Sequence, residues 1–133
     1  FAVQGVYHTH LDERHAAVNE TFAAQQSLVF RGDGGDPEVN RDRVTDLYYT
    51  RNGTTHKLVL PEGEGWAMKE RDFAHTTMLA VWQGELVHGY AEQAVIASLA
   101  VYLVLLENLT LTAAQERATE LWQMRHKQAL PFA

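Results

Sequence analysis

The chain has 133 residues, 46% of them hydrophobic, which is the size of one ordinary domain with a core of its own. We therefore expect a single domain over residues 1–133. The absence of cysteine excludes disulfides, thiolate zinc sites and a cysteine nucleophile. The formal net charge of -6 argues against a nucleic-acid partner, because phosphate contacts need a basic face.

The longest apolar run, residues 94–106, argues against a membrane partner. It is interrupted by Ser98 and is shorter than the about 20 apolar residues that a membrane-spanning helix needs. The run predicts a buried helix. We expect a soluble protein, with a cytoplasmic location favoured over secretion.

The first predicted elements are a strand and a long helix. Residues 1–8 are rich in Val, Tyr and Phe, which predicts a short strand. Apolar residues then recur at steps of three and four, which predicts a helix over residues 12–30 with Thr9 or Asp12 as its N-cap. Three glycines and a proline follow in residues 31–38, so this segment is a predicted loop.

The middle of the chain contains the clearest hairpin. Asn52 and Gly53 supply the positive φ angles of a type I′ turn, between strands predicted over residues 47–51 and 54–60. A short helix is expected over residues 38–46. Residues 66–72 are expected to be a strand or a turn into a helix.

A second hairpin is predicted over residues 76–90. A helix interrupted by Gly84 and Gly89 is the weaker alternative, because each internal glycine costs about 1 kcal/mol relative to alanine. A central helix is expected over residues 92–108. The last helix begins at the capping box formed by Thr112 and Gln115, and it ends before Pro131.

These elements together predict an α+β fold. We expect a small antiparallel sheet, built from the N-terminal strand and the hairpins and packed by three to four helices.

Three histidines within eight residues form the strongest candidate site. If the first strand reaches His10, then His8 and His10 project from one face, because side chains alternate along a strand. Glu13 or His15 would join them from the start of the helix. Imidazoles with one carboxylate suit a divalent metal such as Zn, Fe, Ni or Mn. His8, His10 and His15 are therefore the candidate metal ligands.

The segment Gly-Val-Tyr-His-Thr-His over residues 5–10 resembles the Gly-x-Tyr-His-x-His element of JAMM-type metalloproteases. In that family both histidines hold catalytic zinc, which the resemblance implies for His8 and His10. The likeness covers six residues. Leu11 stands where the family has proline, and the family's following Ser and Asp have no counterpart here, so membership does not follow.

Other polar residues are candidates for acid–base chemistry. Tyr48, Tyr49, His56 and His75 could supply an acid and a base from the sheet, and the approach of His56 or His75 to the N-terminal cluster stays open. The acidic residues 33, 36 and 38 lack the spacing of a twelve-residue calcium loop, which favours a solvated turn.

Two functional hypotheses follow. In the first, Glu13 and His15 are catalytic, and the site uses a divalent metal or proton transfer to act as a hydrolase or lyase on a small polar substrate. In the second, the chain is a non-enzymatic acidic binding or inhibitory module that acts through a protein–protein surface and is homodimeric. Exposed edge strands and aromatic residues would build that surface. The aromatic candidates are Tyr48, Tyr49, Trp66, Trp82 and Trp122.

Overall fold

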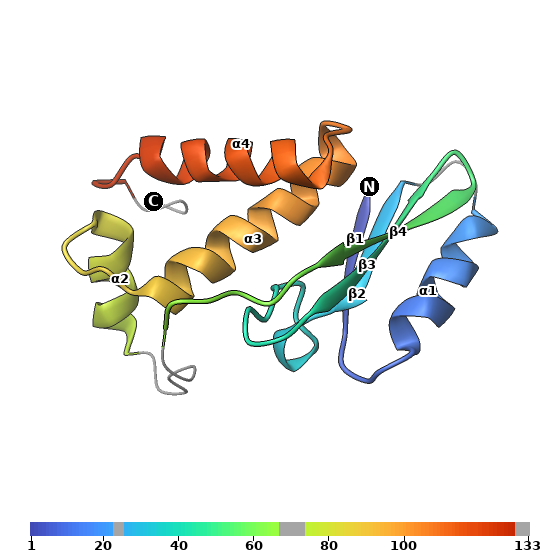
Figure 1. Ribbon diagram of the computed structural model, residues 1–133, viewed down its shortest axis with the longest axis horizontal. Coiled ribbons are helices and arrows are strands. Elements are labelled where there is room, and N and C mark those ends of the chain that lie inside the picture. Colours follow the sequence, from blue (N-terminus) through green and yellow to red (C-terminus); the bar gives the residue numbers. More distant parts are fainter. Residues whose placement is uncertain (23–25, 67–73, 130–133) are drawn as a thin grey trace.

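The computed structural model describes residues 1–22, 26–66 and 74–129 of the chain. Its sheet has four strands in the order β1-β2-β3-β4 (Figure 1). The strands are β1 (Ala2–Val6), β2 (Ser27–Arg31), β3 (Thr45–Arg51) and β4 (Thr54–Leu60). The helices are α1 (Leu11–Glu20), α2 (His75–Gln83), α3 (Gly89–Leu106) and α4 (Leu111–Met124), with a short 3-10 turn, η1, at Asp33–Gly35.

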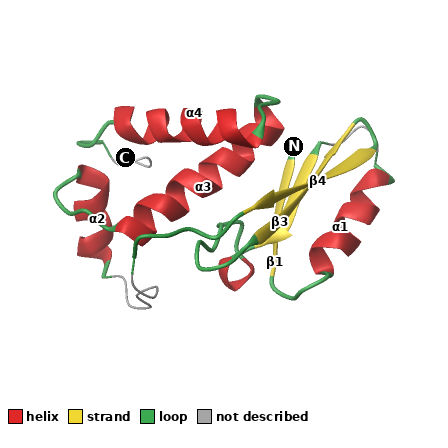
Figure 2. Cartoon of the chain, in the orientation of Figure 1, coloured by secondary structure: helices red, strands yellow, loops and turns green. Residues whose placement is uncertain are grey.

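The predicted α+β class is confirmed, with one difference in the sheet. β1 pairs with β2 in parallel, whereas β2–β3 and β3–β4 are antiparallel, so the sheet is mixed. A parallel pair needs a crossover connection, and α1 provides it. Figure 2 shows the strands between α1 and the group of C-terminal helices.

The helix predicted over residues 12–30 is wrong in its second half. α1 ends at Glu20, and residues 27–31 form strand β2. The reason is that Leu28, Val29 and Phe30 are all at most 1% exposed, because α3 covers one face of the strand and α1 covers the other. A strand buried on both faces has a continuous apolar sequence, which periodicity alone does not separate from a helix.

The main core lies between the sheet and α3. Leu28, Phe30 and Leu47 of the sheet pack against Val101 and Leu105 of α3. A second side of α3 packs against α4 through small residues of that helix. By length and composition α3 could also cross a membrane, but half of it is buried by these contacts, as in the central helix of a folded core.

The hairpin predicted over residues 76–90 is wrong, because this segment contains α2 and the start of α3. Gly84 has a φ of 77° and is the C-cap of α2, where glycine adopts the left-handed conformation without steric cost. Gly89 is the first residue of α3. Both glycines therefore lie at helix ends, where the cost of an internal glycine does not apply.

Of the remaining predicted elements, two are confirmed and one is wrong. The Asn-Gly hairpin is confirmed, with φ angles of 53° at Asn52 and 74° at Gly53. The last helix is confirmed, but its N-cap is Thr110, whose hydroxyl accepts a hydrogen bond from the Ala113 amide. The helix expected over residues 38–46 is wrong: residues 38–44 form a loop, in which the Asn40 side chain accepts a hydrogen bond from the Asp42 amide, and residues 45–46 begin β3. The element expected over residues 66–72 lies largely outside the described residues.

Two adjacent leucines test this packing. Leu105 is 1% exposed against the sheet, whereas Leu106 is 51% exposed. We expect Leu105→Ala to lower the free energy of unfolding by about 2 to 5 kcal/mol, because the cavity it leaves is lined by core side chains. Leu106→Ala should change it by less than about 0.5 kcal/mol. Urea unfolding of both variants measures the difference, and equal losses would contradict the placement of α3.

Candidate functional site

Two of the three N-terminal histidines, His8 and His10, do not lie as predicted, whereas His15 lies on α1 as expected. β1 ends at Val6, so His8 and His10 belong to the loop before α1, and strand alternation does not orient them. His8, His10 and His15 are all exposed. Over residues 1–22, 26–66 and 74–129, no group of three or more His, Asp or Glu side chains is placed to hold a metal ion. The metal interpretation therefore gains no support from the geometry.

A polar cleft of about 330 Å³ lies beside the start of α1. It opens where the parallel strands β1 and β2 end, a position where α/β sheets commonly bind ligands. His10 and Glu13 of the predicted cluster line this cleft, whereas His8 and His15 do not. The full lining is Thr9, His10, Asp12, Glu13, Arg31, Arg43, Val44, Thr45, Asp46 and Tyr48.

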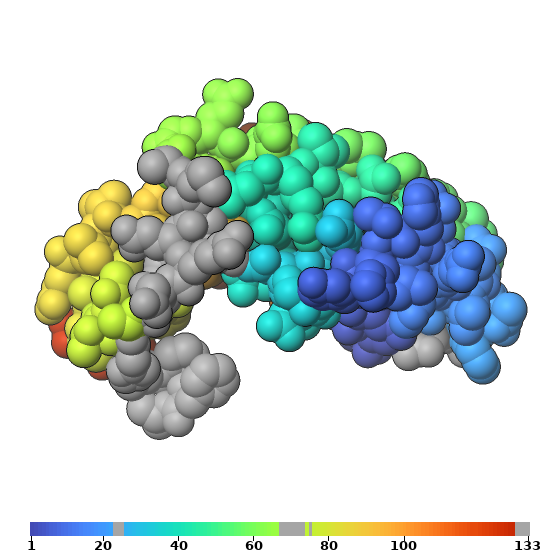
Figure 3. Space-filling model, turned by 90° about the horizontal axis from the view of Figure 1, so that it is seen from below, coloured from blue at the N-terminus to red at the C-terminus, as the bar shows by residue number. Residues whose placement is uncertain are grey.

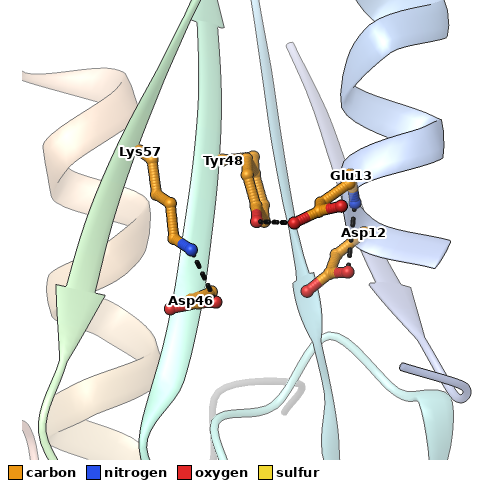
Figure 4. Close-up of polar contacts among 5 residues, drawn as sticks. All are labelled: Asp12, Glu13, Asp46, Tyr48 and Lys57. Carbon is orange, nitrogen blue, oxygen red and sulfur yellow. Dashed lines mark hydrogen bonds and ion pairs between the residues drawn. The ribbon is translucent and has the colours of Figure 1, made fainter. Parts of the chain in front are cut away.

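The central contact of the cleft joins Tyr48 to Glu13. Tyr48 lies on β3 and is 8% exposed, and its hydroxyl donates a 2.9 Å hydrogen bond to Oε1 of Glu13 on α1 (Figure 4). Burial raises the pKa of the Tyr48 phenol, and the hydrogen bond to Glu13 raises it further. The phenol therefore stays protonated at neutral pH and acts as a donor to the carboxylate.

An ion pair between Lys57 and Asp46 lies beside the Tyr48–Glu13 hydrogen bond. Lys57 Nζ lies 2.8 Å from Asp46 Oδ2 and 5.4 Å from the centre of the Tyr48 ring. The hydrogen bond to Asp46 raises the pKa of Lys57, and the contact with Tyr48 adds to it. Lys57 and Tyr48 are partners in the β3–β4 register, so their side chains leave the sheet on the same face.

Asp12 fixes the first turn of α1 beside Glu13. It is 8% exposed, and its Oδ1 accepts a 3.0 Å hydrogen bond from the Glu13 amide. Carboxylates in the first turn of a helix are stabilised by the helix dipole. The predicted side-chain caps do not form: the N-cap is His10, in the left-handed conformation with a φ of 68°.

Two guanidinium groups form the opposite wall. Arg43 donates to the carbonyl oxygens of Arg31 and Gly32 at 3.1 and 2.8 Å, and Arg31 Nε donates to the Tyr7 carbonyl at 3.2 Å. Burial lowers the pKa of Arg43, and the charge of Arg31 lowers it further, so the two cations repel each other. Within the described part of the chain, neither forms an ion pair with a carboxylate.

Sequence reasoning found part of this cleft. It identified Glu13 as catalytic and placed Tyr48 among the possible acids, but it missed Asp46, Lys57 and the two arginines. The hairpin register could have paired Tyr48 with Lys57. Of the other candidates, His56 stacks on Tyr49 with ring centres 4.9 Å apart, on the face turned to α3. The His75 side chain lies outside what the structure describes.

Comparison with known proteins does not add a family to this picture. No protein-family model matches the chain, and no curated protein sequence is similar to it. The chemistry of the cleft is therefore inferred from its own residues.

The raised pKa of Tyr48 predicts a pH dependence of stability. A phenol whose pKa is higher in the folded state than its usual 10.0 stabilises the fold below that pH, and this contribution is lost as pH rises through the folded pKa. We expect Tyr48→Phe to lose less stability than the unaltered protein above about pH 10. Urea unfolding at neutral and alkaline pH measures this.

The matched control is Tyr7→Phe, because Tyr7 is 61% exposed. Its alkaline loss of stability should equal that of the unaltered protein. Tyr90 and Tyr102 also have raised pKa values because of burial, so part of the alkaline loss will remain in every variant. Identical curves for Tyr48→Phe and the unaltered protein would contradict the assignment.

Proposed function

We propose that the polar cleft binds a small anionic substrate and moves a proton on it, so that the chain is a hydrolase or lyase for a small polar molecule. One observation carries the proposal: a pair of guanidinium groups and a carboxylate held by a buried phenol line the same 330 Å³ cleft. The two guanidinium groups suit the binding of an anion, and the carboxylate with its phenol partner suits proton transfer.

The two arginines supply the anion-binding half. Arg31 and Arg43 are both half-buried, and their mutual repulsion would be relieved by a carboxylate or phosphate group between them. A guanidinium also matches these groups geometrically, because it offers two parallel N–H donors. The helix dipole of α1 is already met by Asp12 and Glu13, so the anion belongs on the arginine side of the cleft.

Glu13 supplies the proton-transfer half. Tyr48 occupies one acceptor position of its Oε1 oxygen, and a carboxylate has about four such positions. The remaining positions can take a proton from a bound substrate. Tyr48 positions Glu13 through this hydrogen bond, and His10 lines the same cleft. His15 does not line the cleft, so this mechanism does not use it.

The metal-dependent form of the hypothesis rests on weaker support. A divalent metal such as Zn, Fe, Ni or Mn would need His8, His10 and His15 in one coordination sphere. These residues are separated between an exposed loop and α1, and the described residues offer no converging group of three. The proton-transfer form requires only Glu13 and its bond to Tyr48.

The alternative function is an acidic binding or inhibitory module that forms a homodimer. It is supported by exposed apolar side chains near α2 and α3, including Val87 at 84% and Met78 at 44%. Such a surface suits a protein partner. Substitutions in the cleft distinguish the two functions. If the alternative holds, these substitutions should leave partner binding or dimer formation unchanged.

The test of the proposal uses two anions and one exchange reaction. Calorimetric titration with malonate and with inorganic phosphate measures anion binding, and we expect Arg31→Gln to weaken it about ten-fold. Proton exchange from the methyl group of pyruvate into D₂O, followed by NMR, measures proton transfer. Glu13→Gln should slow this exchange at least about 100-fold while anion binding persists.

The controls are chemically matched substitutions on α4. Arg117→Gln and Glu116→Gln lie on its surface, away from the cleft, and should change neither measurement. Absence of saturable anion binding, or equal weakening by Arg31→Gln and Arg117→Gln, would contradict the binding half. Undiminished exchange in Glu13→Gln would contradict the catalytic half.

A further inference from the structure

A second cavity, of about 540 Å³, lies between α2, α3 and the loop that contains η1. Its volume is within the range of about 300 to 1,000 Å³ that is usual for small-molecule sites. We infer that this cavity binds a small apolar molecule carrying one protonated amine. On the face shown in Figure 3, the cyan segment with η1 lies between the blue N-terminal segment and the yellow segment of α2. The cavity shares no described lining residue with the polar cleft, so it is distinct from that cleft and independent of the proposed function.

The apolar part of the cavity lies along α3, where Leu99 also packs against the cluster between α3 and α4. Ala94, Val95 and Leu99 line it from α3, and Met78 lines it from α2. Val95 is 41% exposed and Met78 is 44% exposed, so apolar surface at the cavity remains in contact with water. Burying such surface under an apolar ligand removes it from water, which favours binding.

The polar groups of the cavity select the charge of the ligand. Two carboxylates, of Asp33 and Glu38, and three hydroxyl groups line it. The hydroxyl groups belong to Tyr90, Ser98 and Tyr102. Among the described residues that line the cavity there is no Lys, Arg or His, so the charge of this described lining is complementary to a cation and opposed to an anion.

Glu38 is the carboxylate best suited to meet an amine. Partial desolvation raises its pKa, and the nearby charge of Asp36 raises it further. Both effects make the ionised form less favourable, and the positive charge of a bound ammonium group would offset them. Asp33 is less free to adapt, because its Oδ1 accepts a hydrogen bond from the Asn40 side chain.

The acidic wall is held in place before any ligand binds. Ser98 Oγ accepts a 2.9 Å hydrogen bond from the Val39 amide, and the Tyr102 hydroxyl donates to the Pro37 carbonyl. Both side chains come from α3 and also line the cavity. A preformed wall lowers the entropy that binding must lose, which favours a small ligand.

A glycine fixes the same loop from its other side. A Cβ atom at Gly32 would lie 1.6 Å from the Asp36 carbonyl oxygen. Only glycine permits this close approach of the two backbone segments. The loop that carries Glu38 therefore packs against the end of β2 and is also hydrogen-bonded to α3.

The test compares three probes of one shape: 2-phenylethylamine, 2-phenylethanol and phenylacetate. Their affinities are measured by NMR chemical-shift titration at 150 mM salt, which screens the attraction of the net negative charge for amines. We expect the amine to bind about ten-fold more tightly than the alcohol, and phenylacetate to bind most weakly, because one charge-assisted hydrogen bond separates the first two. Equal affinities of amine and alcohol would overturn the proposal.

Two variants locate the binding. Glu38→Gln should reduce the amine to the affinity of the alcohol, whereas the matched Glu116→Gln on α4 should leave the preference intact. Val95→Trp should weaken all probes at least ten-fold, since the larger ring fills the cavity from a partly exposed position. An amine preference that survives Glu38→Gln would overturn the proposal, and this comparison stands even if Val95→Trp alters the fold.

Discussion

The position of α1 on the sheet depends on hydrogen bonds more than on apolar burial. Of its three buried residues, only Ala16 is apolar; the others are Asp12 and Asn19. The helix is bonded to the strands near its start by Tyr48 and Glu13. Near its end, Asn19 bonds Gln4 and Glu20 bonds the Thr55 amide. The Tyr48–Glu13 bond is the one of these that also shapes the cleft. It couples the docking of the helix to the chemistry of the site.

The two faces of β3 perform different tasks because side chains alternate along a strand. Tyr48 turns toward α1 and forms the cleft, whereas its neighbour Tyr49 turns toward α3 and packs in the core. Polar side chains on the face of β3 that meets α1 therefore do not disturb the core packing on the opposite face. α3 packs against both the sheet and α4, and residues of this helix also line the 540 Å³ cavity.

The sequence predicted those parts of the fold that local chemistry determines. The Asn52–Gly53 turn requires positive φ angles, and few residue pairs other than Asn-Gly accept them, so the hairpin could be predicted. The final helix could be predicted from its amphipathic spacing. Strand β2 could not, because its three consecutive buried residues are explained by helices on both faces of the sheet, which lie far away in the sequence. The hairpin prediction places Gly84 in a turn and Gly89 in a strand, because the sequence alone does not show that both lie at helix ends.

The site was predictable in part. Glu13 was chosen because it lies in a histidine-rich segment, but its partner Tyr48 is brought to it by the docking of α1 on the sheet. The arginines gave no signal at all, since their proximity depends on the loop that follows β2. The prediction that His8 and His10 share one face of a strand is wrong, because β1 ends at Val6.

A double-mutant cycle between Tyr48 and Glu13 tests the central claim most directly. The free energy of unfolding is measured for Tyr48→Phe, Glu13→Ala, the double variant and the unaltered protein at neutral pH. A hydrogen bond between the two side chains predicts a coupling energy of about 1 kcal/mol, because the double variant loses less than the sum of the single losses. Strictly additive losses would contradict the contact, and with it the positioned carboxylate on which the proposed function depends.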